Sequence, residues 1–569
     1  MTILKQNEKH SYRLEIVLLS LIVICYLAQT VVFGSRLVNF PLDLISVYHS
    51  YNIPRLYDAI ASQNPAHILA QITSLCYPPM QTALHLLNAQ IFNRSITAVI
   101  AASNLPYLLM LIIFGYLLGK RLLDRVTGIL FAIFVSLLPM AYGAASTVSL
   151  DFPMMGLASM CVYMLLRSES FNSTKWSVLF AISLGWGMMT KETFLLYVIG
   201  PMVYSLAFGA LSDGGPDKKK YMKNIVLAAG ITLAIDFIYY CLPGYGRSIL
   251  VTGMMTEYND IPWYSVESLR LFTLGLSESQ LTPPFFLVFL AGLWYFAKSA
   301  SSPLKKYLIL WILVPNMVVM LMPHWKTARY LMPVLPALAL VAALGARKIM
   351  VWRFGKALVA LAVAAGIAQY FVINFMESRY ITHEEDSIDS GPVYYSYTDA
   401  SLPYRVKAEK SARIKRIYES IAKITAPAPG KSEYSLFIPC YVESVWNIHF
   451  MKDYLWFNNM PLPEELDLVY SGLDGINEAA KDPDKYDSVL FSVTKERQSL
   501  IKQGYLSLEV LIACYQDTMR FHAGNKGDEK LDMKQLEISW NRITSVFSVR
   551  TLAYEDEKIA IYYYRKPPA

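Results

Sequence analysis

The sequence predicts a polytopic α-helical membrane protein, with about eleven transmembrane helices and a C-terminal extracytoplasmic α/β domain. Apolar residues make up 54% of the 569 residues and charged residues only 17%, whereas soluble domains average about a quarter charged. Apolar runs long enough to cross a bilayer recur up to Phe375, and beyond it the composition becomes charged and mixed. We therefore assign residues 1–376 to a transmembrane domain and residues 377–569 to the outer domain.

The first apolar run, Leu14 to Phe33, has the length of a bilayer span and lacks a small-residue cleavage site before the segment that follows it. We interpret it as a retained first helix. Residues 34–93 form a first outer loop that contains amphipathic helices. Within it, Met80 to Phe92 has apolar residues at helical spacing with polar residues between them, which favours a helix lying in the membrane interface, with His85 as an interface residue.

Further spans are expected at about 98–118, 126–146, 152–167, 176–192, 193–211, 224–242, 282–298, 306–322, 329–346 and 356–375. Alternate loops carry the basic residues, from Lys120-Arg121 to Arg353 and Lys356. Because cytoplasmic loops are enriched in Lys and Arg, this pattern predicts a cytoplasmic N-terminus and an outer C-terminal domain. All of these basic loops lie on the cytoplasmic side only if Met80 to Phe92 does not cross the membrane.

The outer domain is expected to contain helices at 411–424 and 531–547, strands at 434–438 and 488–492, and a terminal hairpin at 549–554 and 558–564. Its sequence contains no catalytic motif. The six cysteines have no CxxC or metal-ligand spacing, and the sequence does not establish whether Cys440 and Cys514 pair. The net charge of +7 lies in short clusters between apolar runs, so it does not indicate nucleic-acid binding.

Ionisable residues at the outer ends of the predicted helices are the candidates for chemistry. Each has a plainer explanation as a helix cap, a solvated turn or a side chain that reaches lipid headgroups. Cations at outer turns nevertheless oppose the positive-inside bias, and carboxylates and cations on one face would suit a phosphate-bearing substrate and an acid/base step. The positions are Asp43 after the first helix, Asp151 between two spans, Lys191 and Glu192 at an outer turn, and His324, Lys326, Arg329 and Tyr330 at another.

Two further features are less decisive. Asp236 is a carboxylate inside a predicted span, without a partner that the sequence identifies. The outer loop from Gly244 to Pro284 is long and aromatic and contains Arg270. It is expected to act either as a lid over a ligand at the outer face or as part of an interfacial aromatic belt.

These residues resemble the pattern of the membrane glycosyltransferases of the C-type fold, in the branch of dolichyl-phosphate-mannose protein mannosyltransferases and lipid A aminoarabinose transferases. The similar features, in order, are Asp43 with His49, Tyr77-Pro78-Pro79-Met80, Asp151, Thr190-Lys191, and the Lys-x-x-Arg-Tyr-Leu-x-Pro-x-x-Pro segment from Lys326 to Pro336. Together they cover about residues 13–375. The chain departs from many relatives at Leu44, where they have Glu, and at Cys76-Tyr77, where the aminoarabinose transferases have an acidic and a basic residue.

The resemblance implies a hexosyl- or pentosyltransferase of the cell envelope, similar to mannosyltransferases, that uses a polyprenyl-phosphate-linked sugar and transfers it with inversion at the outer face. It implies Asp43 as the catalytic carboxylate, Asp151 as a second active-site acid, and Lys191, Lys326, Arg329 and Tyr330 as donor-phosphate contacts. His49, Tyr77, Glu192, His324 and Arg270 are further site candidates. No cofactor is certain, and a divalent metal at Asp43 stays open.

Expected partners are the lipid-linked donor, the bilayer, and a glycan, lipid or protein acceptor. The expected location is a bacterial inner membrane, because the sequence lacks retention signals and eukaryotic inserts. The alternatives are a transporter or lipid flippase with an outer-face charged gate, and a membrane-anchored scaffold. Transporters tend to have broken helices or paired repeats at mid-membrane, and neither is evident in this sequence.

Overall fold

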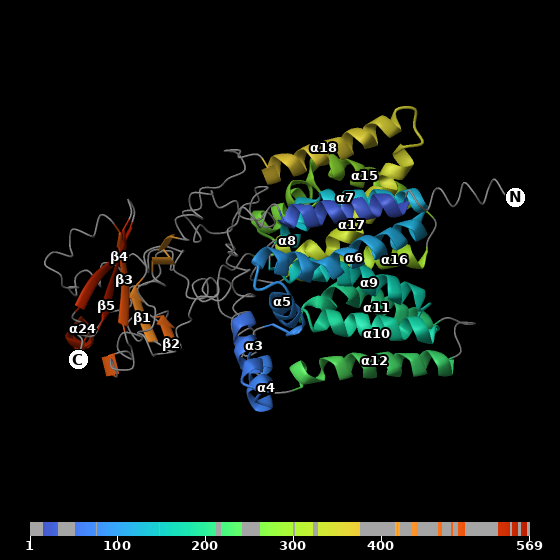
Figure 1. Ribbon diagram of the computed structural model, residues 1–569. Helices are drawn as coiled ribbons and strands as arrows, with labels where there is room; N and C mark the ends of the chain where they lie inside the picture. The colour runs from blue at the N-terminus through green and yellow to red at the C-terminus, as the bar shows by residue number, and fades with distance from the viewer. Residues whose placement is uncertain are drawn as a thin grey trace. The chain divides into compact units, whose positions relative to one another are not determined.

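The structure is a computed structural model of the full chain. It describes residues 15–31, 52–75, 77–146, 148–211, 218–241, 262–299, 302–321, 328–375, 416–417, 419–420, 435–440, 465–468, 480–481, 488–494, 533–546, 549–555 and 559–565. The chain divides into two compact units, one containing the helices up to Phe375 and the other containing the strands near the C-terminus (Figure 1). Each unit is described by itself.

The first unit is a helical bundle that begins with the helix Glu15–Val31. The elements that follow in the described part of the unit are α3 (Asn52–Ala61), α4 (Pro65–Ser74), α5 (Met80–Ile91), α6 (Ile96–Leu122), α7 (Arg125–Leu137), α8 (Pro139–Ala145), α9 (Asp151–Arg167), α10 (Thr174–Met188), α11 (Phe194–Leu211), α12 (Lys218–Tyr240), α14 (Val266–Gly275), the π-helix η1 (Leu276–Gln280), α15 (Thr282–Lys298), α16 (Pro303–Leu321), the 3-10 helix η2 (Ala328–Val334), α17 (Leu335–Ile349) and α18 (Gly355–Phe375).

Three helices among the described residues are long and apolar enough to cross a membrane: Ile96–Leu122, Pro303–Leu321 and Tyr330–Ile349. A fourth span results if α7 and α8, which meet at an angle of 67°, are counted as one. A helix lies at each position where the sequence predicts a span, but α9, α10 and α15 have only 17, 15 and 17 residues. The fold is therefore an α-helical bundle with several apolar helices, and the number of about eleven spans stays a prediction.

The structure corrects the sequence-based boundaries at places rich in proline. The span predicted at 126–146 is two helices, because Leu138 has an extended backbone before Pro139, which starts α8. Proline disfavours the helical conformation of the residue that precedes it. The span predicted at 329–346 begins as the 3-10 helix η2, which contains Pro333. Part of the loop predicted from Gly244 to Pro284 is helical, as α14 and η1.

The long helices run side by side, and α3 and α4 lie across one end of the bundle (Figure 1). The opposite end contains the loops with the basic residues. There the Arg347 Nε donates to Asp124 Oδ2 at 2.7 Å, and Tyr116 donates to Glu15 Oε2 at 2.6 Å. Arg125 lies 3.8 Å from the other oxygen of Glu15. These contacts tie the first helix, α6, α7 and α17 together at the basic end.

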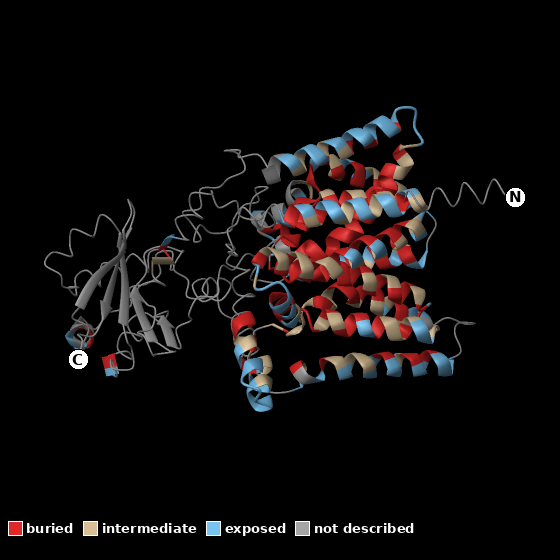
Figure 2. Cartoon of the chain, in the orientation of Figure 1, coloured by how far each residue is buried: buried red, intermediate tan, exposed pale blue. Residues whose placement is uncertain are grey.

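Burial within the bundle is uneven (Figure 2). α9 and α17 are buried along most of their length, whereas α12 and α18 expose apolar residues on one face. Small residues let α17 approach α15 closely: a Cβ at Gly345 would lie 2.2 Å from the Val288 carbonyl oxygen, and one at Gly292 would lie 2.0 Å from that of Val341. Close backbone approach between small residues is a common way of packing helices in membranes.

α5 is a helix, as expected, but its polar face is turned inward. His85 is 1% exposed and Gln81 is buried beside it, while Leu87 and Ile91 are exposed. Asn88 donates from Nδ2 to Ser103 Oγ on α6 at 2.9 Å. The expectation of His85 as an interface residue is therefore wrong, because His85 and Asn88 find hydrogen-bond partners within the protein rather than in water.

The second unit contains a five-stranded sheet of order β2-β1-β3-β5-β4. β1 (Ser435–Cys440) pairs in parallel with β2 (Glu465–Leu468) and β3 (Ser488–Thr494). β5 (Ile559–Arg565) pairs antiparallel with β3 and with β4 (Val549–Glu555), the two strands for which the sequence predicts a hairpin. The helix α24 (Met533–Val546) precedes β4 and buries Trp540 and Ile543. The outer location of this unit stays a prediction.

Candidate functional site

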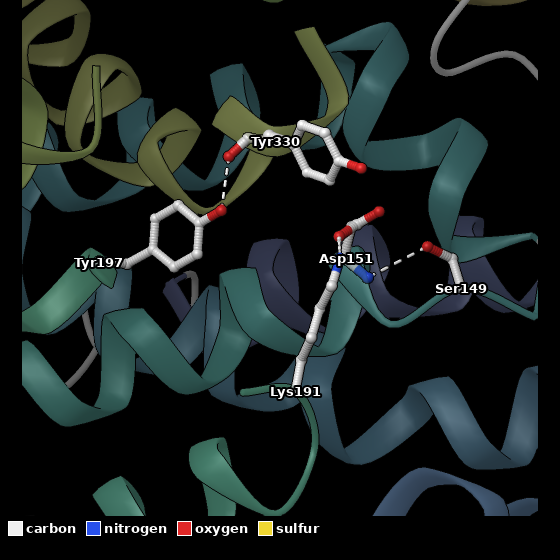
Figure 3. Close-up of polar contacts among 5 residues, drawn as sticks. All are labelled: Ser149, Asp151, Lys191, Tyr197 and Tyr330. Atoms are coloured by element: carbon white, nitrogen blue, oxygen red, sulfur yellow. Dashed lines mark hydrogen bonds and ion pairs between the residues drawn. The ribbon is translucent and has the colours of Figure 1, made fainter. Parts of the chain in front are cut away.

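A buried ion pair lies at the end of the bundle opposite the basic loops. Asp151 is the first residue of α9, and Lys191 lies in the turn between α10 and α11. Lys191 Nζ donates to Asp151 Oδ1 at 2.7 Å, and the two residues are only 5% and 2% exposed. Figure 3 shows the Lys191 side chain extending to the carboxylate. Because a charge buried without a partner is costly, each of these residues needs the other.

Tyr330 provides an aromatic face beside the pair (Figure 3). The Lys191 Nζ lies 5.4 Å from the centre of the Tyr330 ring, within the range of a cation–π interaction. Tyr330 belongs to η2, whose backbone is held from two other helices. The Tyr197 hydroxyl donates to the Tyr330 carbonyl oxygen at 2.6 Å, and Trp311 Nε1 donates to the Pro333 carbonyl oxygen at 3.0 Å.

The turn that carries Lys191 is tightly closed. The backbone N–H groups of Thr190 and Lys191 both donate to the Gly187 carbonyl oxygen, at 3.0 and 3.1 Å. A Cβ at Gly187 would lie 2.1 Å from the Phe194 ring, so a larger residue would push α10 and α11 apart. The N–H of Met80 donates to the Met189 carbonyl oxygen at 3.1 Å, which attaches the start of α5 to the same turn.

The two residues after Lys191 have polar atoms without hydrogen-bond partners. Glu192 Oε1 and Thr193 Oγ1 are both buried, and neither has a partner among the residues that the structure describes. Burial raises the pKa of Glu192 above its ordinary value, although its own backbone N–H and the charge of Lys191 act in the opposite direction. Thr190 in the same turn differs, because its hydroxyl donates to the Trp186 carbonyl oxygen at 2.9 Å.

The structure thus brings Asp151, Lys191 and Tyr330 together, and Glu192 directly follows Lys191 in the chain. Tyr77 is half-buried just before α5. Arg329 lies in η2 and Arg270 in α14, but the structure describes neither side chain. The predicted site residues Asp43, His49, His324 and Lys326 lie outside the described residues.

Sequence reasoning did not identify Tyr197, Ser149 or Thr193. Ser149 Oγ accepts the Asp151 backbone N–H at 3.1 Å, which supports the start of α9. A serine two residues before the first residue of a helix is a recognisable signal for such a contact. Tyr197 bonds to a backbone atom 133 residues away, and no local pattern in the sequence indicates that contact.

Asp236 is buried on α12, at 7% exposure, and its Oδ1 has no hydrogen-bond partner among the described residues. No group of three His, Cys, Asp or Glu side chains suited to a metal ion occurs in the described part of the chain. The predicted metal-binding residue, Asp43, lies outside that part.

Residues 77–240 match the family model of dolichyl-phosphate-mannose-protein mannosyltransferase. Among solved structures, ArnT from Cupriavidus metallidurans bound to undecaprenyl phosphate is similar with a TM-score of 0.59 and 13% identity, over 95% of this chain and 97% of that one. The chain has an ArnT-like fold. Apo ArnT gives a TM-score of 0.58 at 14% identity over the same shares of both chains.

The archaeal oligosaccharyltransferase AglB from Archaeoglobus fulgidus, in complex with an inhibitory peptide and a dolichol-phosphate, is a more distant neighbour. Its TM-score is 0.51 at 11% identity, over 87% of this chain and 71% of that one. No curated protein matches the sequence. The family match covers Asp151 and Lys191, and the resemblance to the mannosyltransferase and aminoarabinose transferase branch that the motifs indicated is confirmed.

Proposed function

We propose that this protein is an integral membrane glycosyltransferase that moves a sugar from a polyprenyl-phosphate donor to an acceptor at the outer face of the membrane. The observation that carries the proposal is the buried Asp151–Lys191 pair beside Tyr330, at one end of a bundle with an ArnT-like fold. The residues matched by the mannosyltransferase family model include this pair. ArnT and AglB are both described with polyprenyl phosphates, the class of donor proposed for this chain.

Lys191 is the proposed contact of the donor phosphate. An ammonium group has three donors, and Lys191 Nζ donates to one carboxylate oxygen of Asp151, Oδ1. Asp151 then acts as a positioning residue, since it holds Lys191 Nζ at a defined place in a site of low exposure. A cation placed where charge develops on a leaving phosphate stabilises the transition state most strongly when water is excluded.

Arg329 and Lys326 are proposed as further phosphate contacts because they flank or belong to η2, which also carries Tyr330. Arginine can grip phosphate with two parallel hydrogen bonds, while lysine acts as a point charge. Their side chains lie outside the part that the structure describes, so their role rests on sequence position alone.

Asp43 is the proposed base that takes the proton of the acceptor hydroxyl. The segment that contains it begins after Val31 and ends before Asn52. Gln29, near the start of that segment, donates to the Tyr142 carbonyl oxygen on α8 at 3.2 Å, and α3 lies across the same end of the bundle (Figure 1). Both ends of the segment are therefore anchored at the end that contains Asp151 and Lys191, which supports placing Asp43 there.

A single displacement at the anomeric carbon requires one base and gives inversion. The acceptor oxygen forms the new bond to the anomeric carbon, the bond to the phosphate oxygen breaks, and the proton passes to Asp43. The polyprenyl phosphate leaves with the electron pair. No step in this scheme depends on a metal, and a divalent ion at Asp43 stays a separate proposal that chelation during the assay would test.

The test is sugar transfer by the full chain reconstituted in liposomes with undecaprenyl-phosphate-linked sugars as donors. The native chain is expected to transfer sugar with inversion, and Asp43→Asn to lose at least about a hundredfold of the rate, the lower range of general-base contributions. Sugar movement across the bilayer without covalent transfer would instead favour the transporter or flippase. Undiminished transfer by Asp43→Asn would remove this residue from the mechanism.

A further inference from the structure

Two buried polar atoms directly follow the lysine of the ion pair. Glu192 Oε1 and Thr193 Oγ1 have no hydrogen-bond partner among the described residues, although both atoms are shielded from solvent. Leaving a buried donor or acceptor unpaired destabilises the folded protein, because the group loses its hydrogen bonds to water and gains none in return. Most buried polar atoms in proteins are paired, so unpaired ones next to a site of function need a reason.

The surrounding turn gives no structural reason for these unpaired atoms. Its backbone is bonded at Met189, Thr190 and Lys191, and the carbonyl oxygen of Lys191 accepts the N–H of Phe194 at 3.0 Å. The hydroxyl of Thr190 is also satisfied within α10. The turn therefore closes without a contact from Glu192 Oε1 or Thr193 Oγ1 among the described residues.

We propose that Glu192 and Thr193 form a subsite that binds hydroxyl groups of the sugar in the lipid-linked donor. This inference rests on the proposed function and adds the recognition of the sugar to it. A carboxylate accepts hydrogen bonds from hydroxyl groups, and a threonine hydroxyl can donate as well as accept. Neighbouring residues with these two groups can bond to neighbouring hydroxyls on one sugar ring.

The position beside Lys191 suits a sugar better than a phosphate. In the donor, the sugar is joined directly to the phosphate, so a group that binds the sugar must lie close to the group that binds the phosphate. Glu192 follows the proposed phosphate contact, Lys191, directly in the chain. Its carboxylate would repel phosphate oxygens but would accept hydrogen bonds from hydroxyl groups.

The experiment compares binding of two kinds of lipid to the full chain in nanodiscs. The probes are undecaprenyl phosphate without sugar and the same lipid carrying mannose, glucose or 4-amino-arabinose, and each of these lipids is measured separately. Glu192→Gln is expected to weaken binding of the sugar-bearing lipid about tenfold, since a hydrogen bond to a charged group contributes about 1.5–3 kcal/mol and 1.4 kcal/mol is tenfold. Binding of the sugar-free lipid is expected to change less than about twofold.

Thr193→Val is a second variant of nearly the same shape and is expected to show a smaller loss for the sugar-bearing lipid only. The matched control is Glu169→Gln, the same substitution at an exposed glutamate between α9 and α10, which is expected to leave both affinities unchanged. Thermal unfolding of each variant establishes that it is folded.

Equal losses for both lipids in Glu192→Gln, or no loss for either, would overturn the sugar subsite. So would a native chain that binds the sugar-bearing lipids no more tightly than the sugar-free one, or a loss confined to the amino sugar, which indicates recognition of an ammonium group. If the native chain binds neither kind of lipid, the proposed function itself fails.

Discussion

Lys191 and Asp151 come from different helix connections and are separated by 40 residues. Their charges are nearly removed from water, so the stability of each depends on the partner. Removing one partner of a buried ion pair costs about 3–5 kcal/mol, because the other charge then stays buried without compensation, whereas removing both can be nearly neutral.

We therefore expect Lys191→Met and Asp151→Asn each to lower the free energy of unfolding by about 3–5 kcal/mol. The double variant is expected to be at least as stable as the less stable of the two single variants. The measurement is a double-mutant cycle on the thermal unfolding of the purified chain. If the decrease in the free energy of unfolding of the double variant equals the sum of the two single decreases, the ion pair is contradicted.

His85 is another residue whose environment departs strongly from water. The ring Nδ1 lies 2.8 Å from the Gln81 carbonyl oxygen, which can only accept, so Nδ1 carries the proton in this contact. Burial lowers the pKa of His85 to about 4 from its ordinary value of 6.5. The helix α5 that carries it lies outside the predicted spans.

A histidine with a depressed pKa in the folded state binds fewer protons there than in the unfolded state. The stability of the native chain should therefore fall as the pH decreases from about 6.5 to about 4, as linkage requires. His85→Gln is expected to flatten this dependence when melting temperature is measured across that range. An unchanged slope in the variant would show that other groups cause it.

At the scale of elements, α15 and α17 pack closely because Gly292 and Gly345 each lie against the backbone of the other helix. A methyl group at Gly345 would lie 2.5 Å from the Gly292 backbone nitrogen, besides its approach to Val288. Neither neighbouring atom belongs to a flexible side chain, so one helix would have to move.

Gly345→Ala and Gly292→Ala are expected to destabilise the chain by about 1–3 kcal/mol, the usual cost of overpacking. Gly230→Ala on α12 is the matched control, because a Cβ there meets nothing within 4 Å. It is expected to be neutral or to stabilise by up to about 1 kcal/mol through helix propensity. Melting temperatures of the three variants provide the comparison, and equal effects at all three sites would contradict the packing account.

At the scale of the whole molecule, the bundle has two chemically different ends. The loops with Lys and Arg lie at one end, and the Asp151–Lys191 pair lies at the other. The positive-inside rule then predicts that the pair faces away from the cytoplasm. The outer location of the proposed chemistry depends on this orientation.

The orientation can be measured with a membrane-impermeant maleimide on intact cells. Ala66→Cys on α4 and Thr174→Cys at the start of α10 place one exposed thiol at each end, each in a chain whose six native cysteines are changed to serine. We expect labelling of the Ala66 variant in intact cells and of the Thr174 variant only after lysis. The reverse pattern would place the ion pair on the cytoplasmic side.

The sequence by itself determined where the apolar helices lie and which loops are basic. These are local properties, because the hydrophobicity of about twenty consecutive residues and the charge of the next loop are read without knowing the neighbours in space. It also indicated Asp151, Lys191 and Tyr330 as members of one site. It did not predict the break at Leu138 or the inward polar face of α5, which depend on proline geometry and on polar partners from α6.

Only the tertiary structure decided that Asp151 and Lys191 form a bonded pair and that Tyr197 holds the backbone of Tyr330. It also showed that Glu192 Oε1 and Thr193 Oγ1 are buried without a hydrogen-bond partner in the described part of the chain. Such contacts join residues from helices that are distant in the chain, and their geometry follows from how the helices pack. Packing is set by the fit of many side chains at once, so a local pattern can nominate the residues of a site but cannot assign their partners.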